Sequence, residues 1–250
     1  MDPFDQYIAL VREYVDQRSS MGRPVRHWDA RPDSRAVKHG ERPRDSLVLK
    51  ENTAVELGGP ETASCWFTLW TGNTSLLSDG RTSLIGPDVP DGLQSRLPFG
   101  QVTLVASESL QEHSLIEIER ALHTAERIPG YSVRRTGGKV WARVSHDAFD
   151  GGFSLQALGE RVTQHLRTGL PGVDAAEILF VTSCEEDVRA LETIGAQVRK
   201  LSHDLRRQRL VRAADGALEC QSTLSCEECP DRPVCDDIRE LISVRKKSTT

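Results

Sequence analysis

The chain has 250 residues, of which 38% are apolar and 28% charged, and its formal net charge is −5 at pH 7. This is globular composition, sufficient for one large or two small domains. No apolar run approaches the ~20 residues that a membrane span needs, and the acidic, helix-patterned N-terminus resembles neither a signal nor a transit peptide. The negative charge argues against a dedicated nucleic-acid binder. We therefore expect a cytoplasmic protein that binds neither membranes nor nucleic acid.

Three segments are expected along the chain. Residues 1–46 should hold an amphipathic helix over 3–18 and then an irregular linker. Residues 47–200 should form the main domain, and residues 201–250 a basic helix, a cysteine-rich hairpin and a tail. Within the main domain, short β-rich runs at 46–50, 65–70, 82–86, 97–106, 139–145 and 176–183 alternate with helical patterns at 108–127, 154–168 and 185–200. The mixture predicts an α+β fold, with helices packed on a mixed sheet and a C-terminal metal-binding hairpin.

Four of the six cysteines fall within one short stretch, spaced Cys220-x5-Cys226-x2-Cys229-x5-Cys235. A C-x2-C pair lets two thiolates reach one metal from a single turn, and the flanking cysteines can complete a tetrahedral shell. In a chain without a secretion signal, such clustering indicates a metal or iron–sulfur site rather than a disulfide framework. The spacing alone leaves zinc and a [4Fe–4S] cluster both open.

A second pattern, His-Asp-Ala-Phe-Asp-Gly at 146–151, directly follows the strand expected at 139–145. This H-x-x-x-D-G sequence resembles the active-site motif of chloramphenicol-acetyltransferase-like and plant acyltransferase families. The resemblance implies that His146 is a general base for the acyl acceptor and that Asp150 orders the local structure. The alternative is a strand-to-helix turn whose geometry is set by Asp150 and the two glycines that follow it.

Several stretches of the middle of the chain share an order and similar gaps with one known family. They are ENTAVELGGPETAS (51–64), FTLWT (67–71), DGRTSLIGPDV (79–89), SRLPFG (95–100), KVWARVS (139–145), GGFSLQALG (151–159) and AEILFVT (176–182). Together they resemble acetyl-CoA synthase, the beta subunit of the carbon monoxide dehydrogenase complex. The resemblance spans about residues 47–235, which correspond to the family's middle domain and the start of its cluster domain.

The resemblance carries expectations about the site. In the family, the middle domain is associated with coenzyme A near the strand matched here by Trp141 and Arg143. An indole can pack on adenine, and a guanidinium can fork onto phosphate. Cys226, Cys229 and Cys235 match iron–sulfur ligands, and Cys220 would serve as a local fourth ligand, which favours [4Fe–4S] over zinc.

One departure from the family limits the expected chemistry. The sequence contains no Cys-Gly-Cys, the family's holder of the distal nickel, so we expect no nickel-based assembly of acetyl groups from CO. The expected protein is an iron–sulfur protein that binds or acts on coenzyme A or an acyl thioester, leaning towards a transferase and working with a redox or pathway partner protein. Two alternatives stay open: a non-catalytic scaffold or binding protein with a structural zinc, and an acyltransferase that uses His146.

Overall fold

The computed structural model describes residues 3–29, 47–91, 95–108, 114–208, 210–212 and 218–220. At its centre lies a five-stranded mixed sheet with the order β1-β4-β9-β6-β3. Its strands are β1 (Val25–Trp28), β3 (Ser64–Thr71), β4 (Thr82–Ile85), β6 (Phe99–Ala106) and β9 (Ala175–Val181). The β4–β9 and β3–β6 pairs are parallel, whereas β1–β4 and β6–β9 are antiparallel.

A smaller four-stranded sheet, with the order β5-β2-β8-β7, carries the region of interest for function. It consists of β2 (Thr53–Gly58), β5 (Arg96–Leu97), β7 (Tyr131–Thr136) and β8 (Lys139–Ser145). A separate two-stranded ribbon joins β10 (Leu210–Arg212) to β11 (Leu218–Cys220). Short helical turns lie at Lys50–Asn52, Thr74–Leu76, Val89–Asp91 and, as α3, at His146–Asp150.

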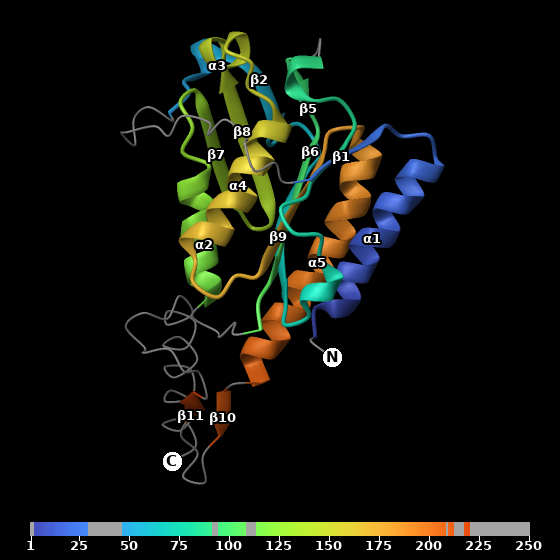
Figure 1. Ribbon diagram of the computed structural model, residues 1–250, viewed down its shortest axis with the longest axis vertical. Helices are drawn as coiled ribbons and strands as arrows, with labels where there is room; N and C mark the ends of the chain where they lie inside the picture. Colours follow the sequence, from blue (N-terminus) through green and yellow to red (C-terminus); the bar gives the residue numbers. More distant parts are fainter. Residues whose placement is uncertain are drawn as a thin grey trace, which may run out of the picture.

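The large sheet is covered on both faces, as Figure 1 shows. Helices α1 (Asp5–Ser20) and α5 (Glu185–Gln208) pack on one face, while α2 (Ser114–Ala125), α4 (Leu155–Gly169) and the small sheet pack on the other. The alternation along β9 explains this, because Leu179 and Val181 join the core beneath α1 and α5, whereas Ile178 and Phe180 join the core beneath α4. Both faces of β9 are therefore apolar, as in a buried strand.

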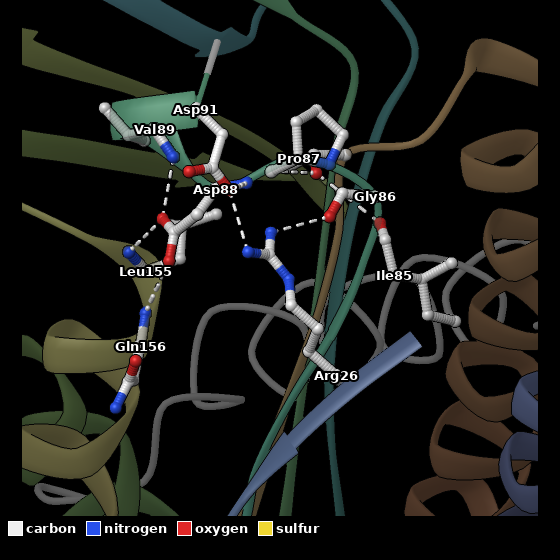
Figure 2. Close-up of polar contacts among 10 residues, drawn as sticks. Arg26, Ile85, Gly86, Pro87, Asp88, Val89, Asp91, Leu155 and Gln156 are labelled. Atoms are coloured by element: carbon white, nitrogen blue, oxygen red, sulfur yellow. Dashed lines mark hydrogen bonds and ion pairs between the residues drawn. The ribbon is translucent and has the colours of Figure 1, made fainter. Parts of the chain in front are cut away.

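The loop after β4 is anchored by the carboxylate of Asp88, which is buried (Figure 2). Asp88 accepts hydrogen bonds from the backbone N–H groups of Val89 (2.7 Å), Leu155 (2.6 Å) and Gln156 (3.3 Å). The last two belong to the first turn of α4, whose N–H groups have no partner within the helix. Asp88 thus ties the end of β4 to the start of α4, which gives the GPDV part of the resemblance a structural role.

Most of the expected elements are confirmed, but several differ. The strand expected at 46–50 is wrong over its described part, because residues 47–49 belong to no strand and a helical turn begins at Lys50. The linker expected before residue 47 instead contributes β1, which pairs with β4. Strands β2 and β7 were not expected, and α5 is one continuous helix to Gln208. Of the helices that the structure describes, none is both long and apolar enough to cross a membrane.

Candidate functional site

A pocket of about 400 Å³ opens over the outer face of the small sheet. Its walls come from the segment before β2, from the end of α2 and the residues after it, and from β7 and β8. Trp141 and Arg143, the two residues expected near coenzyme A, both line this pocket. They point outward because Val140, Ala142 and Val144 alternate with them along β8 and fill the core.

The indole of Trp141 has two close neighbours. The guanidinium carbon of Arg143 lies over the ring, 4.5 Å from its centroid. A Cβ on Gly59 would come within 3.0 Å of Cδ1 and 3.1 Å of Nε1 of the indole, so a larger residue would not fit there without a shift. Trp141 Nε1 is buried and has no hydrogen-bond partner within the described part of the chain.

A carboxylate holds Arg143 in place. Arg143 Nε donates to Glu56 Oε1 at 3.1 Å, across the β2–β8 pair in which these residues are register partners. Arg96 Nη2 donates to Glu56 Oε2 at 2.8 Å. Burial alone would raise the pKa of Glu56, but the hydrogen bonds from Arg143 and Arg96 outweigh it and lower the pKa below the ordinary value. Glu56 is therefore a firmly ionised anchor.

Among the remaining charges of the pocket, the basic groups outnumber the one carboxylate without an ion pair within the described ranges, Glu51, which favours an anionic ligand. Lys50, Arg127 and Arg134 line it, and no ion pair involves them among the residues that the structure describes. The buried Glu126 faces the same pocket, but its carboxylate is bound by Arg135, with Nη1 donating to Oε2 at 2.6 Å. The basic groups without partners are thus available for phosphate, for which guanidinium groups have matching donors.

A second hollow of about 460 Å³ adjoins the first, since Arg134 and Trp141 line both. Its floor includes the turn from Gly59 to Ser64. The N–H of Gly59 donates to Val140 O at 3.3 Å, so this turn does not present that donor to an anion. The second hollow therefore extends the space next to Trp141, but the Gly59 N–H does not add a phosphate-binding donor to it.

The second candidate motif lies elsewhere. His146 and Asp150 are both exposed at the two ends of the short helix α3, and neither lines either of the two hollows described above. Ser145 caps this helix by accepting from Ala148 N, and Gly152 has a φ of +83°. The turn therefore has the geometry that its Ser and Gly residues favour, while the role of His146 as a base stays a prediction.

The predicted metal site lies largely outside the described residues. Cys226, Cys229 and Cys235 are not among them, and of Cys220 only the backbone is described, paired with Leu210 in the β10–β11 ribbon. Within the described residues, no three His, Cys, Asp or Glu side chains come together in a way that could hold a metal ion. The four-cysteine site remains a prediction.

Sequence reasoning missed Glu56 and Arg134, and it considered Gly59 only as part of a turn with Gly58 and Pro60 whose N–H groups could bind an anion. Glu56 and Gly59 lie on and just after β2, a strand that the sequence did not predict. The alternation of Ala54 and Glu56 with the buried Val55 and Leu57 was a usable signal for a half-buried strand. Even so, pairing of Glu56 with Arg143 depends on a contact between residues 87 positions apart.

Comparison with known proteins gives a consistent result. A family model described as the CO dehydrogenase/acetyl-CoA synthase complex beta subunit matches residues 36–188. Three curated relatives are named acetyl-CoA decarbonylase/synthase complex subunit beta, and the one from Methanocaldococcus jannaschii is named subunit beta 1. The relative from Methanothermobacter thermautotrophicus is 29% identical over 80% of this chain, that from Methanocaldococcus jannaschii 27% over 75%, and that from Methanopyrus kandleri 28% over 74%.

The match covers only part of each relative. The aligned region amounts to 43%, 26% and 41% of the three relatives' own lengths, so this chain corresponds to less than half of each. The names of these relatives describe subunits of a multi-protein complex.

Proposed function

Since the chain belongs to the CO dehydrogenase/acetyl-CoA synthase complex beta subunit family, we propose that it binds coenzyme A or an acyl thioester of coenzyme A in the pocket beside Trp141. The observation that carries this proposal is the set of three basic side chains without ion pairs, Lys50, Arg127 and Arg134, next to Trp141 and the Arg143 guanidinium that lies over its ring. A nucleotide with several phosphates needs both features, a flat surface for the base and guanidinium or ammonium donors for the phosphates.

Each basic residue of the pocket would make its own contact with the ligand. Arg134 and Arg127 would bind phosphate oxygens through charge-assisted hydrogen bonds, and Lys50 would add a third positive charge. The pocket volume of about 400 Å³ lies in the ordinary range for small-molecule sites. The adjoining hollow, which shares Arg134 and Trp141, would accommodate the rest of a ligand longer than the first pocket.

The proposal extends to the C-terminal cysteines. Cys220, Cys226, Cys229 and Cys235 would hold one [4Fe–4S] cluster, with a single zinc as the alternative. A cluster would supply electron transfer when bound, and the chain would then work beside a partner protein of an acyl-transfer pathway. The relatives are named as subunits of a complex, which supports a partner of this kind.

Calorimetric titration of the full chain with coenzyme A tests the proposal. We expect saturable binding that weakens as salt is raised, because phosphate contacts are screened. Replacing Arg134 by Ala should weaken binding about tenfold, the value of one charge-assisted hydrogen bond. The matched control is Arg167→Ala, which removes an exposed arginine paired with Asp79 and away from the pocket walls, and it should leave the affinity unchanged. Absence of heat at millimolar coenzyme A would rule out the proposal.

A further inference from the structure

One wall of the pocket is a short segment before β2, residues 47–52, which we call the strap. Five of its six residues are exposed, and only Val48 is buried, although it belongs to neither core cluster of the described residues. The hydrogen bonds of the strap are local: Asn52 N and Thr53 Oγ1 donate to Leu49 O at 3.1 and 2.9 Å. No hydrogen bond or ion pair joins it to another element that the structure describes. Val48 is therefore its main attachment to the body.

The strap joins β2 at an irregular point of the β2–β8 pair. Thr53 pairs with Ser145 and Val55 with Val144, so the register shifts between Thr53 and Val55. An extra residue of this kind interrupts the ladder and lets a strand bend. From Val55 to Gly58 the pairing is regular. The irregularity thus provides a point about which the strap can turn while the rest of β2 stays in the sheet.

The strap brings both apolar surface and positive charge to the pocket. Leu47 and Leu49 line the pocket and yet are 60% and 59% exposed. Lys50 follows them, lines the same space and has no ion pair among the described residues. A single exposed leucine is ordinary, but two at the mouth of a basic pocket offer apolar surface that an inward turn of the strap would remove from water.

We propose that the strap is a closing wall of the pocket. When an anion occupies the pocket, the strap turns about the irregularity between Thr53 and Val55, moves Lys50 towards the anion and buries Leu47 and Leu49. Segments that close over ligands belong to the less stable parts of a fold, and a segment attached mainly through Val48 meets that condition. The inference rests on the proposed function for the identity of the anion, since the same pocket is proposed to take coenzyme A.

Hydrogen exchange of the full chain, followed by mass spectrometry, tests the inference with coenzyme A and inorganic pyrophosphate as separate probes. With either probe bound, we expect the amides of 49–52 to exchange about tenfold more slowly and those of 55–58 to stay unchanged. The double variant Leu47→Ser/Leu49→Ser keeps the charges but removes the apolar surface. It should lose the slowing and bind coenzyme A about tenfold more weakly. The matched control is Met21→Ser, which removes an exposed apolar side chain at the end of α1, away from the pocket walls, and should change neither quantity.

The outcomes separate the two proposals. If neither probe binds, both proposals are overturned. If pyrophosphate binds and slows exchange in the strap while coenzyme A does not bind, the proposed function is overturned and the closing strap stands. Binding of a probe without slower exchange over 49–52 overturns the closing strap alone, as does a double variant that keeps the slowing or the full affinity. Equal slowing over 55–58 also overturns it, because the ligand would then stabilise the whole sheet rather than close the strap.

Discussion

At the scale of single residues, the most heavily buried charge beside the pocket is that of Glu126. Its carboxylate accepts from Arg135 Nη1 at 2.6 Å and from Gln101 Nε2 at 3.0 Å, and Arg135 in turn donates to Gln101 Oε1 at 2.9 Å. The guanidinium also lies over Trp66, 5.2 Å from the ring centroid. This network links the wall of the pocket to β6, so its integrity supports the position of β7.

Replacing Arg135 by Met should therefore destabilise the protein by about 3–5 kcal/mol, because it leaves the Glu126 carboxylate buried without its counter-charge. Urea unfolding at pH 7 measures the change. The control is Arg189→Met, which breaks an exposed pair with Glu185 and should cost less than about 0.5 kcal/mol. Similar losses in the two variants would show that the buried pair has no special role.

The contribution of the Glu56–Arg143 ion pair to folding stability should depend on pH in a definite direction. Hydrogen bonds from Arg143 and Arg96 lower the pKa of Glu56 in spite of its burial. A carboxyl whose folded pKa lies below its unfolded pKa contributes stability that is fully present above the unfolded value and is lost as pH falls through the folded value. The contribution should therefore be constant above about pH 5 and decline only in more acidic solution.

The measurement is the difference in unfolding free energy between the unaltered chain and Glu56→Gln at a series of pH values. We expect a constant difference from pH 8 down to about pH 5 and a shrinking one below it. A difference that already declines between pH 7 and pH 6 would contradict the assigned direction of the pKa shift. Glu13→Gln, which changes a carboxylate whose contact is an exposed hydrogen bond with Gln17, provides a comparison.

At the scale of elements, the attachment of α4 depends on two caps of different strength. Asp88 accepts from two N–H groups of the first turn and from Val89, whereas Ser154 accepts only from Ala157 N at 3.0 Å. Asp88→Ala should cost about 2–3 kcal/mol and Ser154→Ala about 1 kcal/mol, both measured by urea unfolding. The prediction fails if the serine substitution is equally or more destabilising.

The elements also show which parts of the fold a sequence can predict. Helix α4 was predicted from its apolar spacing and from Ser154, and the structure confirms both. Strand β2 was missed although its alternation is a usable signal, because the adjacent glycines weaken the β pattern and its partner β8 lies far along the chain. The run expected as a strand at 46–50 has strand-like composition, but its described residues, 47–50, have no strand partner, and β-propensity without a partner does not make a sheet.

At the scale of the whole molecule, the N-terminal helix belongs to the main body. Phe4, Ile8, Val11 and Tyr14 of this segment are buried in the core shared with α5. Tyr14 donates to the backbone oxygen of Asp187 at 2.8 Å. The guanidinium groups of Arg18 and Arg23 lie within 3.0 Å of the Asp187 carboxylate. A helix held by so many contacts is part of the main body of the protein (Figure 1).

The candidate site, like strand β2, could be predicted only in part from the sequence, because strand pairing between distant segments was not predictable. The resemblance to a known family singled out Trp141 and Arg143, and both lie on the wall of the same basic pocket. What the sequence could not supply is the register of β2 against β8, which places Glu56 beside Arg143 and Gly59 over Trp141. That register decides which residues a ligand meets beside the indole.

The four clustered cysteines near the C-terminus are predicted to bind an iron–sulfur cluster. Protein purified without oxygen should contain about four irons per chain and show a broad visible absorption band, if Cys220, Cys226, Cys229 and Cys235 hold a cluster. Cys226→Ser should lose the iron, whereas Cys184→Ser, a half-buried cysteine at the start of α5, should retain it. One zinc per chain in a colourless sample would contradict the cluster and make the cysteine segment a structural staple. Coenzyme A binding would then be the remaining test of a role in acyl chemistry, because the pocket beside Trp141 is built from residues of the small sheet and not from these cysteines.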